Sequence, residues 1–263
     1  MTNAGVAGGV VNDGCPAVLV MDNGTTAAAI ADAFPNVVVM FRRFWPHGFR
    51  PTAEQIADAM PRHPRIRYCL HNEWDNYPND PVAIAARADV EIQAAQIMRS
   101  RGGYGLALAG GWSHGTPDMW SNDIASVFRT KYAPHYNTGL IGMDWHLYSP
   151  TLSHVMDQWY EGRWRRVFDD DIGFYPGIRA IYCSETGVDV PGGPGGFPAV
   201  GATQQEFLDW CKRWLAYQSQ PVRGKPSPLV ASVIFQHGGN GDPQWNRFDI
   251  GPYMETFKVV WRA

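Results

Sequence analysis

The chain has 263 residues, of which 45% are hydrophobic and 18% are charged, and its formal net charge is −3. This length suits one large domain, and the apolar content is enough to bury a sizeable core. The near-neutral charge and the scattered basic residues give no electrostatic reason to expect a nucleic acid or an anionic membrane as a partner. We therefore expect a single domain over residues 1–263 that folds on its own.

The cysteines lack the CxxC spacing of a metal site, and we predict four buried thiols at Cys15, Cys69, Cys183 and Cys211. No apolar segment reaches the length of about 18 residues that a membrane span needs, and no basic stretch precedes an apolar one at the start. We expect no membrane partner and no standard signal peptide. That leaves a cytoplasmic location or release by a non-standard route.

Apolar runs of strand length alternate with helical stretches, which is typical of parallel βα units. The clearest predicted strands cover residues 17–21, 37–41, 66–70, 104–109, 140–143, 178–183 and 229–235. A weakly marked strand over residues 5–11 would come first and make eight.

Helix signals fill the gaps between these strands. A long helix is predicted from Asp80-Pro81 to Arg101, because Asp is favoured at the N-cap, Pro at the first helical position and Gly after the end. Capping-box spacing marks two further helix starts, Thr52 with Gln55 and Thr203 with Glu206. The alternation of strands and helices is therefore supported at the helix ends.

The run Val37-Val38-Val39-Met40-Phe41 is apolar on both faces, as a strand covered on both sides would be. An open doubly wound sheet gives the same local pattern, but no dinucleotide GxGxxG or phosphate-loop motif opens a helix after a strand. We predict an α/β fold, a single (β/α)8 TIM barrel.

Two glutamates follow predicted strands, Glu73 after residues 66–70 and Glu185 after residues 178–183. If residues 5–11 form the first strand, these are strands four and seven, which face each other across the barrel. Active sites of such barrels lie at the C-terminal ends of the strands. Two carboxyl groups at that rim, about 5 to 5.5 Å apart, suit hydrolysis of a glycosidic bond with retention.

At these residues the sequence resembles the clan A glycoside hydrolases, which carry Asn-Glu after strand four and Glu after strand seven. The resemblance covers residues 17–250 and extends to short phage lysin-like and uncharacterised bacterial members. The motifs that carry it are Asn72-Glu73, Asp144-Trp145-His146-Leu147-Tyr148, Ser184-Glu185-Thr186-Gly187, Gln236-His237 and Trp245 within residues 244–249.

The resemblance implies a role for each matching residue. Glu73 would be the acid/base and Glu185 the nucleophile, and Asn72 would donate to the sugar 2-hydroxyl. His146 or Tyr148 would hydrogen-bond Glu185. The remaining substrate-binding candidates lie in the loops after the strands: Trp74, Trp112, His114, Gln236 and Trp245. The arginine that the clan often places on an early strand is Arg42 or Arg43, and both stay open.

The function that follows is a retaining hydrolase of β-glycosidic bonds in an oligo- or polysaccharide, acting without a cofactor or metal. Two other classes stay open: a non-catalytic carbohydrate-binding or virion structural protein on the same barrel, and a cell-wall lysin of the same clan. A metal site built on His146 and His114 is a lesser alternative, since no HxH or HExxH pattern supports it. We expect a monomer, although the sequence does not set the oligomeric state.

Three further expectations concern packing. Arginines 163, 165 and 166 are predicted to form a solvated helix face. Cys183 is predicted to pack in the core despite its position beside the nucleophile candidate. Helix packing is expected for four of the tryptophans, Trp159, Trp164, Trp210 and Trp214.

Overall fold

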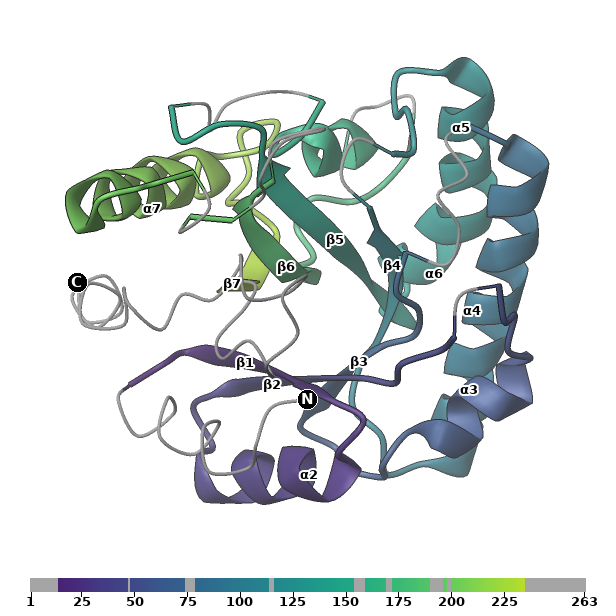
Figure 1. Cartoon of the computed structure of the whole chain (residues 1–263). Coiled ribbons are helices and arrows are strands. Elements are labelled where there is room, and N and C mark those ends of the chain that lie inside the picture. The colour runs from purple at the N-terminus through teal and green to yellow at the C-terminus, as the bar shows by residue number, and fades with distance from the viewer. Residues whose placement is uncertain are drawn as a thin grey trace.

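The computed structural model describes residues 14–46, 48–73, 79–113, 116–153, 159–168, 172–189, 196–197 and 200–234. In this part of the chain, seven strands form one sheet in sequence order, and every neighbouring pair is parallel. The strands are β1 (Ala17–Met21), β2 (Val38–Arg42), β3 (Ile66–Cys69), β4 (Ala107–Trp112), β5 (Ile141–Ser149), β6 (Ile181–Val188) and β7 (Leu229–Ile234). Because β1 and β7 approach each other, the sheet curves into a nearly closed barrel (Figure 1).

Helices surround the strands on the outside of the barrel (Figure 1). They are α2 (Gly24–Ala33), α3 (Ala53–Ala59), α4 (Pro81–Arg101), α5 (Asn122–Val127), α6 (Ala133–Asn137) and α7 (Gln204–Gln218), with a π turn η1 (Phe128–Tyr132) and a 3-10 turn η2 (Arg163–Phe168). None of the described helices combines the length and hydropathy that crossing a membrane requires.

The predicted helix ends are confirmed. The Asp80 side chain accepts from the backbone N–H groups of Val82 and Ala83, and Gly102 ends α4 with φ of 68°. Both predicted capping boxes are present, at Thr52 before α3 and at Thr203 before α7. Each satisfies backbone donors that a helix start otherwise leaves unpaired.

The π turn joins α5 to α6 without a break. The backbone N–H of Ala133 donates to the carbonyl of Phe128, five residues back instead of four. Phe128, Tyr132 and Tyr136 are all fully buried on the side of this segment that packs against the barrel.

The seven clear strand predictions are confirmed, with shifted ends. The largest shifts are in β5 and β6, which continue past their apolar runs to Ser149 and Val188. His146 and Glu185 therefore lie inside strands, and the expectation that Glu185 follows its strand was wrong. Hydrogen bonding between β5 and β6 continues through polar residues, which the apolar signal does not mark. The predicted strand over residues 5–11 lies outside the described residues.

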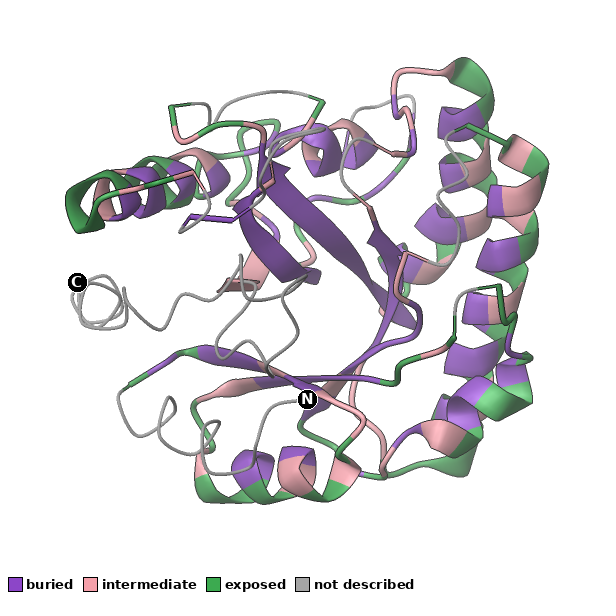
Figure 2. Cartoon of the chain, in the orientation of Figure 1, coloured by how far each residue is buried: buried purple, intermediate pink, exposed green. Residues whose placement is uncertain are grey.

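Two apolar cores share the barrel wall. A small cluster inside the barrel contains Met40, Cys69, Leu108 and Tyr182. The larger one lies between the strands and the helices, and includes Phe41 and Trp145. Strands β4, β5 and β6 are buried at every position, whereas β7 is only partly buried (Figure 2). Successive side chains of a strand point alternately into each core.

The cysteine prediction is confirmed, since all four thiols are free and buried. The arginine prediction was wrong for Arg163, whose side chain is fully buried in η2. Among the tryptophans, Trp164, Trp210 and Trp214 are buried as expected. Trp159 is instead 43% exposed, because it lies between β5 and η2 rather than on a helix, and it contacts the ring of Trp120 with centroids 4.6 Å apart.

Candidate active site

Arg42 ends β2 on the inner face of the barrel. Val38 and Met40 belong to the inner cluster and Val39 and Phe41 to the outer one, so the two-residue period of the strand directs Arg42 inward. Arg43 instead forms a partly exposed ion pair with Asp22, at 3.1 Å. Of the two arginines left open by the sequence, Arg42 is the one that reaches the site.

Strand β5 supplies three polar side chains at alternate positions, Asp144, His146 and Tyr148, and all are buried. Their neighbours Trp145 and Leu147 belong to the outer core. Asp144, the first of the three along β5, binds Ser184 through both carboxylate oxygens. Its Oδ1 accepts from the backbone N–H of Ser184 at 3.0 Å, and its Oδ2 accepts from the Ser184 hydroxyl at 2.8 Å. Burial raises the pKa of Asp144.

An irregularity in β6 brings Glu185 to the inner face. Asp144 pairs with Tyr182 and His146 with Glu185, so three residues of β6 span the distance of two in β5. This bulge reverses the alternation of side chains. Cys183 consequently joins the outer core, where its thiol donates to the backbone carbonyl of Glu185 at 3.0 Å. Packing, as predicted for Cys183, is confirmed.

Glu73 lies just beyond β3 in a left-handed backbone conformation, with φ of 35°. Its backbone N–H donates to the carbonyl of Gly111 in β4 at 2.9 Å. Gly111 is itself left-handed, and a Cβ at this position would lie 2.5 Å from the carbonyl oxygen of His71. The pair Gly110-Gly111 therefore allows the chain carrying Glu73 to approach β4 closely. The side-chain oxygen of Asn72 is buried with no hydrogen-bond partner among the described residues.

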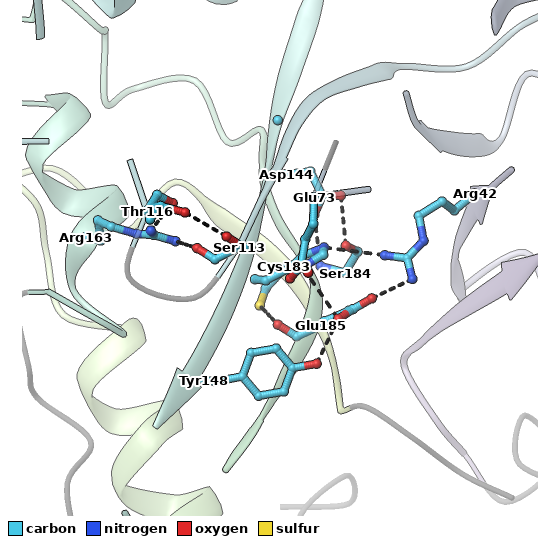
Figure 3. Close-up of polar contacts among 12 residues, drawn as sticks. Arg42, Glu73, Ser113, Thr116, Asp144, Tyr148, Arg163, Cys183, Ser184 and Glu185 are labelled. Atoms are coloured by element: carbon cyan, nitrogen blue, oxygen red, sulfur yellow. Dashed lines mark hydrogen bonds and ion pairs between the residues drawn. The ribbon is translucent and has the colours of Figure 1, made fainter. Parts of the chain in front are cut away.

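Glu185 is the centre of the polar cluster (Figure 3). Arg42 Nη2 donates to Oε1 at 2.5 Å, and the Tyr148 hydroxyl donates to Oε2 at 2.8 Å. Burial tends to raise the pKa of Glu185, but the charges of His146 and Arg42 and the Tyr148 hydrogen bond outweigh it and hold this pKa below its usual value. The carboxylate is therefore ionised at neutral pH.

His146 connects the two glutamates. Its Nδ1 is 2.7 Å from Glu73 Oε1 and 3.5 Å from Glu185 Oε2, while Arg42 Nη1 faces its Nε2 at 3.4 Å. These contacts place a proton on Nδ1, where it hydrogen-bonds Glu73. Burial opposes a charged imidazole, yet the two carboxylates raise the pKa of His146. Of the predicted partners of Glu185, Tyr148 hydrogen-bonds it directly and His146 hydrogen-bonds Glu73 instead.

The same three side chains could hold a cation. Glu73, His146 and Glu185 each offer one ligand atom, and these atoms lie within 4.8 Å of one another. Arg42 weighs against that use, because its guanidinium already occupies Glu185 Oε1 and faces the free nitrogen of His146. A positive charge at this distance repels a metal ion.

A second buried arginine, Arg163, holds the loop that follows β4. Its Nη2 donates to the carbonyl of Ser113 at 2.6 Å and its Nη1 to the carbonyl of Thr116 (Figure 3). Burial lowers the pKa of Arg163 to about 9, and the charge of Glu73 opposes that shift. Arg163 therefore contributes positive potential near Glu73. The sequence offered only a cluster of basic residues, which gives no sign of burial.

The remaining predicted site residues divide into two groups. Trp112 does not line the mouth as predicted. It is buried in the outer core, where Arg87 lies 4.1 Å from its ring centroid, because a register shift between Gly110 and Trp112 turns its side chain outward. Outside the described residues lie Trp74, His114, Gln236 and Trp245.

The fold and the polar mouth define a parallel α/β barrel of the TIM-barrel type. No family model matches the chain, and no curated protein sequence matches it. Solved barrels match the chain in fold, at sequence identities of 9% to 17%.

One such structure is the catalytic domain of a mannanase from Streptomyces sp. SirexAA-E, with 16% identity and a TM-score of 0.52 over 92% of this chain and 72% of that chain. A β-mannanase from Streptomyces thermolilacinus has 17% identity and a TM-score of 0.51, over 89% and 74%. XEG5A, a GH5 xyloglucan-specific endo-β-1,4-glucanase from a metagenomic library, has 9% identity and a TM-score of 0.57, over 98% and 88%. At these identities the likeness establishes the shared fold.

Proposed function

We propose that the protein is a retaining glycoside hydrolase that cleaves a β-glycosidic bond in a polysaccharide. The observation that carries the proposal is the pair Glu73 and Glu185 at the barrel mouth, with one carboxylate oxygen of each within 4.8 Å. Retaining enzymes hold their carboxyl groups about 5 to 5.5 Å apart and inverting enzymes about 6.5 to 9.5 Å. The 4.8 Å bound joins one oxygen of each side chain, and such a close approach favours direct attack by Glu185 on the sugar.

The reactive form of the site carries a proton on Glu73. In the first step, the ionised Glu185 attacks the anomeric carbon and Glu73 donates that proton to the departing glycosidic oxygen. Arg42 and Tyr148 hold the Glu185 oxygens and keep the attacking group charged before the sugar arrives. The products are a glycosyl ester on Glu185 and a free hydroxyl on the leaving sugar. Glu73 is now a carboxylate.

In the second step, Glu73 takes a proton from water as the water oxygen attacks the anomeric carbon. The ester bond breaks, Glu185 regains its charge and the sugar leaves with its original configuration. Asn72 directly precedes Glu73 and would donate its side-chain amide to the sugar 2-hydroxyl, the role that the resemblance assigns to it.

The neighbouring structures suggest where to look for the substrate. Two of them are mannanases, one of which was solved with mannohexaose, and the third is a xyloglucan-specific endo-β-1,4-glucanase in complex with cellotriose. We propose a β-linked polysaccharide of this kind, with mannans and xyloglucan as the first candidates. Among the described tryptophans, Trp45 and Trp120 are partly buried and Trp159 is exposed, and these three are the candidates for stacking on sugar rings.

The test measures reducing ends released from a panel of mannans, xyloglucan, other β-glucans and cell-wall glycans. The variants are Glu73→Gln and Glu185→Gln, and Glu54→Gln on the exposed first turn of α3 is the matched control. We expect wild type and the Glu54 variant to cleave one substrate class, with at least a thousandfold loss in both site variants. Proton NMR of the first product should show the β anomer.

Two other outcomes would replace the proposal. Glycan binding without cleavage, unaffected by Glu185→Gln, would identify a carbohydrate-binding protein. Cleavage that a chelator abolishes and a divalent cation restores would identify a metal-dependent enzyme using Glu73, His146 and Glu185 as ligands. A first product with the α anomer would contradict retention.

A further inference from the structure

A buried ionic cluster lies on α4, outside the proposed catalytic groups. Its centre is Glu91, which is fully buried. Glu91 Oε1 accepts from His71 Nδ1 at 2.9 Å and from Arg87 Nε at 3.3 Å, and Oε2 accepts from the Tyr132 hydroxyl at 2.8 Å. Oε1 also accepts from the backbone N–H of Gly110 at 3.1 Å. Both carboxylate oxygens are therefore occupied by protein donors.

Two of these donors belong to the backbone segments that hold Glu73. His71 lies two residues before Glu73 and two residues beyond the end of β3. Gly110 precedes Gly111, whose carbonyl accepts the Glu73 N–H. Arg87 adds a second contact, since its Nη2 donates to the Gly110 carbonyl. One side chain of α4 thus links the end of β3 to the bulge of β4.

The backbone at Glu73 needs such support. A non-glycine residue with φ of 35° is strained, and its conformation persists only where the surroundings fix it. The contacts at Glu91 are stiff, because the carboxylate is charged and its donors are buried with it. Burial tends to raise the pKa of Glu91, but Arg87 and His71 outweigh it and lower this pKa.

We propose that Glu91 is a positioning residue that holds Glu73 in its left-handed conformation, with its carboxylate against His146, through His71 and Gly110. This inference rests on the proposed role of Glu73 as the acid/base. Glu91 itself has no contact with the reacting atoms. Its influence on the reaction passes through Glu73.

The kinetic test compares how strongly kcat/KM falls for substrates whose leaving groups differ in their need for a proton. A dinitrophenolate departs without a proton, whereas a methylumbelliferone or a sugar benefits from acid catalysis. We would compare kcat/KM, which reports the glycosylation step, on the two aryl glycosides of the sugar that the wild type releases. The variants are Glu91→Gln and Tyr132→Phe, with Glu73→Gln as reference and Ile92→Ala, a buried neighbour on α4, as the packing control.

We expect Glu91→Gln to lower kcat/KM at least twentyfold on the methylumbelliferyl glycoside and less than threefold on the dinitrophenyl glycoside, the pattern of Glu73→Gln. Tyr132→Phe should show the same pattern with a smaller loss, and it also serves if Glu91→Gln does not fold. Ile92→Ala should stay within twofold on both. Equal losses on the two glycosides in Glu91→Gln and Tyr132→Phe, or no loss, would overturn the inference.

A crystal structure of Glu91→Gln, or of Tyr132→Phe, provides a readout that needs no substrate. The distance from Glu73 Oε1 to His146 Nδ1 is 2.7 Å in the native chain, and we expect it to exceed 3.5 Å in the variant. An unchanged distance would refute the positioning role. If wild type cleaves no glycan, the proposed function fails, and this distance still decides whether Glu91 positions Glu73.

Discussion

Replacing Arg42 by methionine removes a buried charge and keeps an unbranched side chain. The lost ion pair to Glu185 is 2.5 Å long, with exposed side-chain fractions of 2% and 8%. A hydrogen bond to a charged group contributes about 1.5 to 3 kcal/mol, which is a loss of about 10- to 100-fold in kcat/KM at 1.36 kcal/mol per factor of ten. The acidic limb of the kcat/KM profile should move upward by about one to two pH units, since 1.36 kcal/mol is one unit.

The free energy of unfolding should also depend on the ionisation of Glu185. The folded-state pKa of Glu185 lies below its unfolded value, so the pair stabilises the fold above the ordinary glutamate pKa of 4.5, and this contribution is lost as pH falls through the folded pKa. Arg42→Met should lower the free energy of unfolding by about 3 to 5 kcal/mol at pH 7, the cost of leaving one buried charge unpaired. The difference from wild type should narrow toward pH 3.

The assay combines urea unfolding at pH 7 and pH 3 with a pH profile of kcat/KM. Arg43→Met is the matched control, because its side chain is 45% exposed and its pair with Asp22 is a surface contact expected to contribute less than about 1 kcal/mol. An Arg42 variant with an unshifted acidic limb and the stability of the Arg43 variant would refute the role assigned to this pair.

Three further substitutions test separate parts of the structure. Gly111→Ala should destabilise the fold by at least about 2 kcal/mol in thermal unfolding, because the added Cβ would clash with the His71 carbonyl oxygen. Gly139→Ala, with φ of 69° and no atom within 4 Å of the added Cβ, should lose only about 1 to 2 kcal/mol, the cost of a left-handed backbone for a residue with a Cβ. Equal losses in the two variants would exclude a close approach of Gly111 to the chain that carries Glu73. Tyr148→Phe should raise the pKa of Glu185 and lower kcat/KM about tenfold, and an unchanged pH profile would contradict the hydrogen bond. Asp80→Ala should cost about 1 kcal/mol of stability with no change in kcat, and a loss above 3 kcal/mol would show that Asp80 does more than cap α4.

Local signals in the sequence were sufficient for the strands and the helix ends. Apolar runs located every described strand, and Asp80 and Thr203 marked helix starts that the structure bears out. The closeness of Glu73 and Glu185 could also be predicted, because strand order in a barrel places their strands across the mouth. These features depend on neighbours in the chain or on topology alone.

Side-chain direction was beyond the sequence for a physical reason. A strand that is apolar on both faces, such as β2, does not reveal which face is inside, so Arg42 and Arg43 were equivalent. An irregular residue in a strand reverses the alternation without changing the composition, which is why Trp112 was placed at the mouth and lies in the outer core. Arg163 was missed because burial of a cation depends on acceptors from a distant loop.

The π turn between α5 and α6 places a constraint on chain length. Each residue of an α-helix turns the chain by about 100°, so residues four apart drift by about 40° around the helix. The wider turn reduces that drift, and Phe128, Tyr132 and Tyr136 stay on one side. Deleting the exposed Thr130 should restore a regular helix and rotate the buried rings on one side of the deletion relative to those on the other. In the segment from α5 to α6, the positions of the buried rings therefore depend more on the number of exposed residues between them than on the identity of those residues.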